Sequence, residues 1–181
     1  LSRSQRVRFR LLTEELLVKN LQEQGVDKAE RIARLADGRP GRAQALAEGE
    51  LEEMDSARST LLELLAGSPV ELFQFSEGLT KGNKAGRIGW QPTVERYLGV
   101  MESLLRDAAS HAVGSSEFLN ADRKDVVHAW SAALYPHGIE RLQKQLSQTR
   151  ERMELNVNAR LLIEPLFAKL ASELGKARQL S

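Results

Sequence analysis

The sequence contains no cysteine, which excludes a disulfide framework and any metal site built on thiolates. Aromatic residues make up only 5% of the chain. No apolar run approaches the roughly 18 residues that a membrane-spanning helix needs, so we expect a soluble, cytoplasmic protein with no membrane partner. His111, His128 and His137 have no second histidine or carboxylate at metal-ligand spacing. We therefore expect surface or cap histidines, no metal and no cofactor.

What is present favours helices. Hydrophobic residues make up 41% and charged residues 28% of 181 residues, and Leu and Ala dominate the apolar set. Apolar positions recur at three and four, so we expect an all-α fold with a small three-helix bundle followed by five to six longer helices. The predicted helices cover about 14–24, 28–37, 43–47, 48–66, 69–77, 92–112, 123–135, 138–155 and 159–174, and Pro165 should kink or restart the last one.

Charge is distributed in blocks. Residues 1–42 carry ten Lys or Arg against six Asp or Glu, residues 43–77 carry one against eight, and residues 78–90 carry three against none. Such blocks can mark surfaces that meet partners of opposite charge, although a solvated face is the more common explanation for any one block.

The start of the chain alternates polar and apolar residues over 6–10, which predicts a short strand. No other strand follows, so we expect the chain to have been cut from something larger. The arginines in this segment have two interpretations of about equal weight. They could contact nucleic acid or phosphate, or they could form the polar edge of a strand.

The stretch 35–43, Leu-Ala-Asp-Gly-Arg-Pro-Gly-Arg-Ala, separates two helical patterns. Gly38 can take the left-handed conformation that closes a helix, and Pro40 suits the first turn of the next one. Arg39 and Arg42, on either side of Gly41, would then lie near free N–H groups, where an anion or a partner's carboxylate could be held.

Several residues are typical of helix starts. Thr13 is expected as an N-cap, with Leu16, Leu17 and Leu21 on one face of the helix that follows. Asp27 with Glu30 and Ser68 with Glu71 match the spacing of a capping box, in which side chain and backbone bond reciprocally. Asp122 is expected to cap a further helix.

A glycine-rich stretch at 78–89 contains Lys81, Lys84 and Arg87 and is the most probable mobile loop. The motif of a phosphate-binding loop, Gly-x-x-x-x-Gly-Lys-Ser/Thr, is absent, and no strand precedes this stretch. No serine lies in a strand-turn-helix elbow, and the Trp and Phe residues fall on apolar stripes typical of a core. The residues alone therefore predict an all-helical interaction module.

Three separated segments resemble one family in the right order. Residues 1–5 followed by Val-Arg-Phe at 7–9 resemble the Ser-Arg-Cys-Gln motif that closes the ATPase-type domain of bacterial DNA polymerase III clamp-loader subunits. The stretch 35–43 resembles the Gly-Ser-Pro-Gly-Arg-Ala corner in the lid of the delta-prime subunits. Residues 155–164 resemble the Asn-x-Asn-x-x-Leu-x-x-Glu pattern at the last helix of the same subunits.

The resemblance implies a non-catalytic piece of a clamp loader for DNA replication, within a complex whose enzyme is the polymerase III holoenzyme. It implies a remnant of the ATPase-type domain over 1–12, a helical lid over 13–48 and a collar over 49–181. The collar would bind the delta and gamma/tau subunits and would contact DNA only indirectly, within the complex. The nucleotide core and zinc module would precede this segment, so it would bind neither ATP nor metal.

Two arginine positions carry further implications of the resemblance. Arg3 matches the arginine finger that reaches a neighbouring subunit's ATP site, although Ser4 replaces the usual cysteine. In gamma and tau subunits an arginine serves as the second nucleotide sensor, and its position corresponds to Gly41 here. Arg42 follows one residue later, which rotates it by about 100° around the helix, so it should not point where a sensor points. Arg39 stands where the family usually has a serine, and nothing in the sequence explains this difference.

Two other classes of function stay open. Arg3 to Arg10 and Lys81 to Arg87 favour a free-standing helical module that binds nucleic acid, which strongly salt-dependent DNA binding would reveal. An enzyme would need a cleft with converging polar groups.

Overall fold

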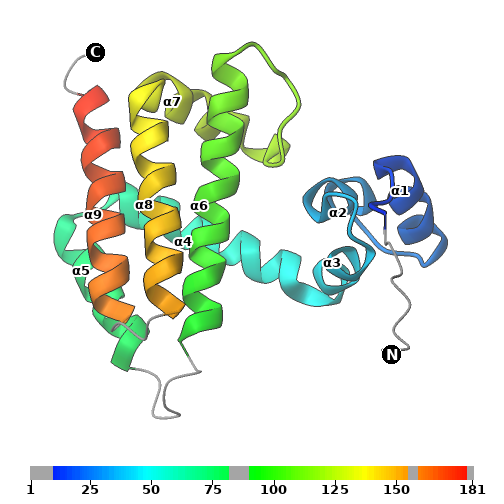
Figure 1. The fold of residues 1–181 in the computed structure, drawn as a ribbon, viewed down its shortest axis with the longest axis horizontal. Helices are drawn as coiled ribbons and strands as arrows, with labels where there is room; N and C mark the ends of the chain where they lie inside the picture. The colour runs from blue at the N-terminus through cyan, green and yellow to red at the C-terminus, as the bar shows by residue number, and fades with distance from the viewer. Residues whose placement is uncertain (1–9, 82–89, 155–158, 179–181) are drawn as a thin grey trace, which may run out of the picture. The chain divides into compact units, whose positions relative to one another are not determined.

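The computed structural model describes residues 10–81, 90–154 and 159–178, and every regular element in these ranges is a helix (Figure 1). The predicted all-α fold is confirmed for this part of the chain. Apart from Arg10, the predicted strand at 6–10 lies outside the described residues. The chain divides into two compact units, 1–53 and 54–181, and their assignment to a lid and a collar stays a prediction.

The first unit contains short helices joined by tight turns. Helix α1 (Glu14–Glu23) packs against α2 (Ala29–Ala36), which packs against α3 (Pro40–Ala45). A kinked segment, η1 (Leu46–Glu50), then leads into α4 (Leu51–Ala66). Gly49 has a non-helical φ of 129°, so the chain is kinked there and the helix predicted over 48–66 begins only at Leu51.

The helix starts of this unit only partly follow the predictions. Thr13 caps α1, and its hydroxyl accepts a hydrogen bond from the Leu16 N–H at 3.3 Å, as expected. Leu17 and Leu21 are buried as predicted, whereas Leu16, which was predicted to share their face, is 50% exposed. The capping box at Asp27 and Glu30 is also wrong, because Lys28 occupies the cap position in a left-handed conformation and its side chain makes no capping bond.

The second unit is a bundle around three helices that lie side by side in Figure 1: α6 (Gln91–Ala112), α8 (His137–Glu154) and α9 (Ala159–Arg178). Helix α5 (Pro69–Lys81) packs against α9. Helix α7 (Lys124–Leu134), preceded by the 3₁₀ turn η2 (Ala121–Arg123), packs against α6 and α9. All three long helices contribute to one hydrophobic core.

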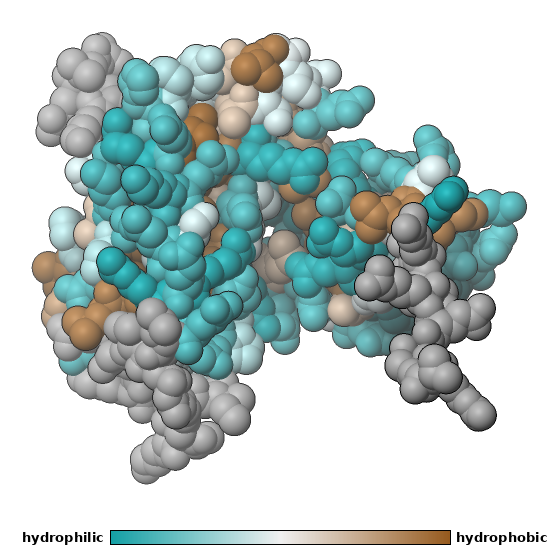
Figure 2. All heavy atoms as spheres, in the orientation of Figure 1, coloured by the Kyte–Doolittle hydropathy of each residue, from teal (hydrophilic) through white to brown (hydrophobic). Residues whose placement is uncertain are grey.

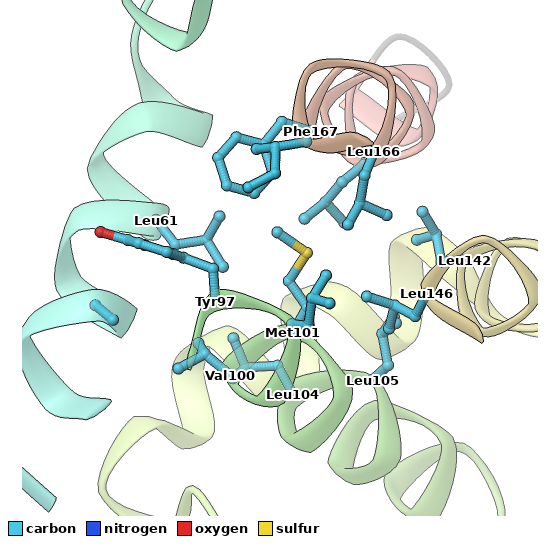
Figure 3. Close-up of a cluster of buried hydrophobic side chains, with 14 of the residues drawn as sticks. Leu61, Tyr97, Val100, Met101, Leu104, Leu105, Leu142, Leu146, Leu166 and Phe167 are labelled. Atoms are coloured by element: carbon cyan, nitrogen blue, oxygen red, sulfur yellow. The ribbon is translucent and has the colours of Figure 1, made fainter. Parts of the chain in front are cut away.

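The middle of this core is shown in Figure 3. Met101 of α6 points toward Leu166 and Phe167 of α9, and all three side chains are almost fully buried. Burying one such side chain is worth about 1.5–3 kcal/mol. Tyr97 lies edge-on to Phe75 and Phe167, with ring centroids 5.3 and 6.0 Å apart, so the predicted apolar stripe of α6 forms the seam of the bundle.

The capping box predicted at the start of α5 is confirmed. The Ser68 N–H donates to Glu71 Oε2 at 2.7 Å, and the Glu71 N–H donates to the Ser68 hydroxyl at 3.3 Å. Helix α5 continues through Gly78 to Lys81, past its predicted end, so only residues 82–89 of the predicted loop lie outside the described residues.

Helix α9 runs through Pro165 without restarting. Proline removes the hydrogen bond to the carbonyl four residues earlier, that of Leu161. Pro165 and Leu161 are both exposed, so water can reach this side of the helix and solvate the carbonyl. Pro165 is therefore tolerated within one continuous helix.

Candidate functional site

The corner between α2 and α3 is built around Gly38. Its φ is +75°, so the predicted left-handed conformation is confirmed, and Asp37 before it is also left-handed at +50°. The Gly38 carbonyl accepts a hydrogen bond from the Leu12 N–H at 2.8 Å. A Cβ at Gly38 would come within 2.7 Å of Leu11 Cβ and 2.8 Å of the Leu12 carbonyl oxygen. The corner therefore needs glycine for its conformation and for this close approach.

The arginines of the corner lie near carboxylates of their own unit. Pro40 occupies the first turn of α3, as predicted. Arg42 Nη1 lies 2.8 Å from Glu50 Oε2, and Arg39 Nη2 lies 3.9 Å from Asp37 Oδ2. The first pair links α3 to η1 at the surface, since both side chains are partly exposed to solvent. Gly41 faces open space, where a Cβ would meet nothing within 4 Å.

Other predicted site residues fall outside the described part of the chain. Arg3 and the arginines at 6 and 8 precede residue 10, and Lys84 and Arg87 lie within 82–89. The arginine-finger role of Arg3 and the DNA-binding alternative therefore stay predictions.

The histidines are not all isolated. The rings of His111 and His128 are stacked, with centroids 4.2 Å apart and planes 18° apart, and Phe118 lies edge-on to both. Spacing along the chain gave no sign of this stacking, because it is α6 and α7 that bring the two rings together. Among the described residues, no group of three or more His, Asp or Glu side chains could hold a metal ion.

A buried polar network also escaped the sequence analysis. Arg58 on α4 is only 7% exposed and donates to both carboxylate oxygens of Asp122. Asp122 was expected to cap a helix, but α7 begins at Lys124 and its cap position makes no side-chain bond. Asp122 is thus the acceptor for a buried guanidinium. A lone arginine in an acidic block was the only sequence signal of this role.

The surface of the second unit is hollowed between α4, α5 and α9, and we call this hollow the α5–α9 groove. Its volume is about 440 Å³. Most lining residues are apolar or small, and Figure 2 shows hydrophobic atoms at the surface where α5 and α9 meet. The described residues lining it are Leu64, Leu65, Gly67, Ser68, Pro69, Leu72, Phe73, Glu164, Ala168, Ala171 and Ser172.

A neighbouring hollow of about 540 Å³ lies between α4, α7 and α9 and shares Leu65 and Ala171 with the α5–α9 groove. Trp130 lines it, and Arg123 and Asp125 lie at its margin. Arg123 Nη2 is 3.0 Å from Asp125 Oδ2, and this hydrogen bond lowers the pKa of the Asp125 carboxyl. The two hollows thus form adjoining apolar surfaces divided by the end of α4.

The α5–α9 groove is suited to holding a protein segment. Apolar walls with few polar groups provide contact area for such a segment. A sequence signal was present, since the small residues Ala168, Ala171 and Ser172 recur at helical spacing and therefore share one face of α9.

No family model, curated protein or solved structure matches the chain. No described helix is long and apolar enough to cross a membrane.

Proposed function

We propose that this chain is the lid and collar part of a delta-prime-type subunit of a bacterial clamp loader. The observation that carries the proposal is the ordered resemblance of three separated segments, at 1–9, 35–43 and 155–164. In this role the chain performs no chemistry of its own. It holds subunits together in the complex that loads the sliding clamp during DNA replication.

The geometry of the corner supports this proposal. Gly38 ends one helix and Pro40 begins the next, which is the arrangement expected from the resemblance to the lid corner. Arg42 is engaged by Glu50 at 2.8 Å, and Gly41 stands where a nucleotide sensor would need an arginine. A subunit with this corner does not sense a nucleotide of its own.

The bundle at 54–181 supports an assembly role, because its two adjoining hollows present apolar surface to a partner. Burial of apolar surface is the main favourable term in most protein association. We propose that delta and gamma/tau subunits contact this unit, and that the unit contacts DNA only through the assembled complex.

The test is a pull-down of the chain with purified delta and gamma/tau subunits from the same organism. We expect co-elution, with loss of it in Ala168→Arg, which places a long charged side chain in the α5–α9 groove. Ala121→Arg is the matched control, since Ala121 is exposed on η2 and lines neither hollow. Absence of association would overturn the proposal. Strongly salt-dependent DNA binding by the chain alone would favour the nucleic-acid module instead.

A further inference from the structure

We propose that the stacked rings of His111 and His128, with Phe118 beside them, form a pH-sensitive contact between α6 and α7. At neutral pH the stacked pair holds the segment 113–118 against the end of α6. When both rings carry a proton, they repel each other and release this segment. The proposal is independent of the assembly role proposed above.

The contact is built from two helices and the segment that connects them. His111 lies in the last turn of α6, and His128 lies within α7. Their ring centroids are 4.2 Å apart and their planes 18° apart, which is a stacked arrangement. Phe118 is only 3% exposed and lies edge-on to both rings, with centroids 5.9 and 6.3 Å away. Both histidine rings therefore contribute to the packing of this buried phenylalanine.

The segment 113–118 is also held by hydrogen bonds to α6, beside whose end it turns back (Figure 1). Near its start, the Ser115 N–H donates to the Ser110 carbonyl at 2.9 Å. Just after its end, the Leu119 N–H donates to Asp107 Oδ1 at 2.9 Å. A change at the rings can therefore loosen the segment while its far end stays bound to α6.

Two protonated imidazoles repel each other when they are stacked. Histidine ordinarily changes its charge near pH 6.5, and His128 is exposed and His111 half-buried, so protons can reach the pair from solvent. Two unit charges about 4 Å apart shift an equilibrium about fivefold in water, and by more where solvent is partly excluded. This factor sets the size of the effect to be measured.

The charged groups around the pair leave this repulsion uncompensated. They are Asp107 on α6, Glu117 in the connecting segment, Asp122 and Arg123 in η2, and Lys124 and Asp125 on α7. Each of the three aspartates already accepts a hydrogen bond from another group. Glu117 and Lys124 are exposed and opposite in charge, so they add no net charge beside the rings.

The direction of the pH effect follows from proton binding. When the segment is released, the rings can separate and take up two protons, whereas the stacked pair disfavours the second proton. Lower pH therefore favours the released state. The contact is fully formed above about pH 7 and is lost as the pH falls toward about 5.

The first experiment measures the coupling between the two rings by a double-mutant cycle. Denaturant unfolding of the 181-residue chain, followed by tryptophan fluorescence, is compared for the unmodified chain, His111→Gln, His128→Gln and the double variant. We expect the histidines to stabilise each other at about pH 7.5, and the coupling factor to fall at least fivefold at about pH 5. The control cycle combines His128→Gln with His137→Gln, because His137 is exposed at the start of α8. Its coupling factor should stay within twofold.

The second experiment detects the release of the segment itself. Amide hydrogen exchange measured by NMR gives protection factors, which are corrected for the intrinsic effect of pH on exchange. We expect the protection of the Ser115 N–H to fall about fivefold between about pH 7.5 and pH 5, while that of Leu119 stays within twofold. His128→Phe keeps an aromatic ring on α7 that takes up no proton, so Ser115 should stay protected at both pH values. Circular dichroism confirms that each variant is folded.

Three results would overturn the proposal: a coupling factor that does not change with pH, an equal fall in the control cycle, or a loss of protection at Ser115 that persists in His128→Phe. Equal losses of protection at Ser115 and Leu119 would also overturn it. They would show that the whole region unfolds, in place of a local release.

Discussion

Arg58 Nη1 donates a hydrogen bond to Asn120 Oδ1 at 2.9 Å, although 62 residues separate them along the chain. Asn120 is itself held by Asp107, whose Oδ2 accepts from its backbone N–H at 2.7 Å and from its side-chain amide at 2.8 Å. One polar network thus joins helix α4, helix α6 and the segment before α7. All three of these side chains are buried.

Replacing Arg58 by Met should destabilise the second unit by about 3 kcal/mol. The substitution keeps an apolar stem but leaves the Asn120 side-chain oxygen buried without its donor and separates Asp122 from its guanidinium partner. Both tryptophans, Trp90 and Trp130, belong to this unit, so denaturant unfolding followed by tryptophan fluorescence reports on it directly.

The control for this prediction is Arg106→Met, because Arg106 is an exposed arginine on α6. We expect a change below about 0.5 kcal/mol there. If the two variants unfolded at the same denaturant concentration, the network at Arg58 would contribute nothing to stability.

Replacing Gly38 by Ala should destabilise the first unit by about 3 kcal/mol. The left-handed conformation costs an alanine about 1–2 kcal/mol, and the new Cβ would also collide with Leu11 and the Leu12 carbonyl. Unit 1–53 contains no tryptophan. Amide hydrogen exchange of α1 and α2 is therefore the appropriate measurement, and both helices should exchange faster.

Gly25→Ala separates the two contributions. Gly25 has a similar φ of +72°, but a Cβ there would meet nothing within 4 Å. We expect this variant to show the conformational cost alone, about 1–2 kcal/mol. Equal effects of the two substitutions would mean that the approach of Leu11 and Leu12 to the corner has no energetic importance.

Burial raises the pKa of the Tyr97 phenol, and this effect outweighs the hydrogen bond to Thr60, which acts to lower the pKa. A raised folded-state pKa stabilises the fold fully below the unfolded value of about 10. That contribution is lost as the pH rises through the folded pKa. The free energy of unfolding should therefore fall above about pH 10, and the fall should be smaller in Tyr97→Phe.

The two tyrosines can be measured separately. Tyr135→Phe leaves Tyr97 as the only phenol, whose ionisation is followed by ultraviolet absorbance at alkaline pH. We expect its midpoint in the folded protein to lie above that of the same variant in denaturant. Coincident midpoints would contradict the burial effect.

Predictions from sequence succeeded where the cause is local. Thr13, Ser68 with Glu71, Gly38 and Pro40 act on backbone groups within a few residues, so their spacing specifies the bond or the conformation. The capping box at Asp27 failed although its spacing matched, because the left-handed Lys28 moved the start of α2. Local patterns therefore identified the helices better than their first residues.

The sequence by itself determined the helical class, the apolar stripes and the glycine corner, because helix periodicity and backbone strain depend on residues near each other in the chain. Only the tertiary structure decided that Asp122 meets Arg58, that the two histidine rings stack and that α4, α5 and α9 line an apolar groove. These pairings depend on which helix faces bury each other. That choice is made by the packing of the whole bundle and is not specified by any one segment.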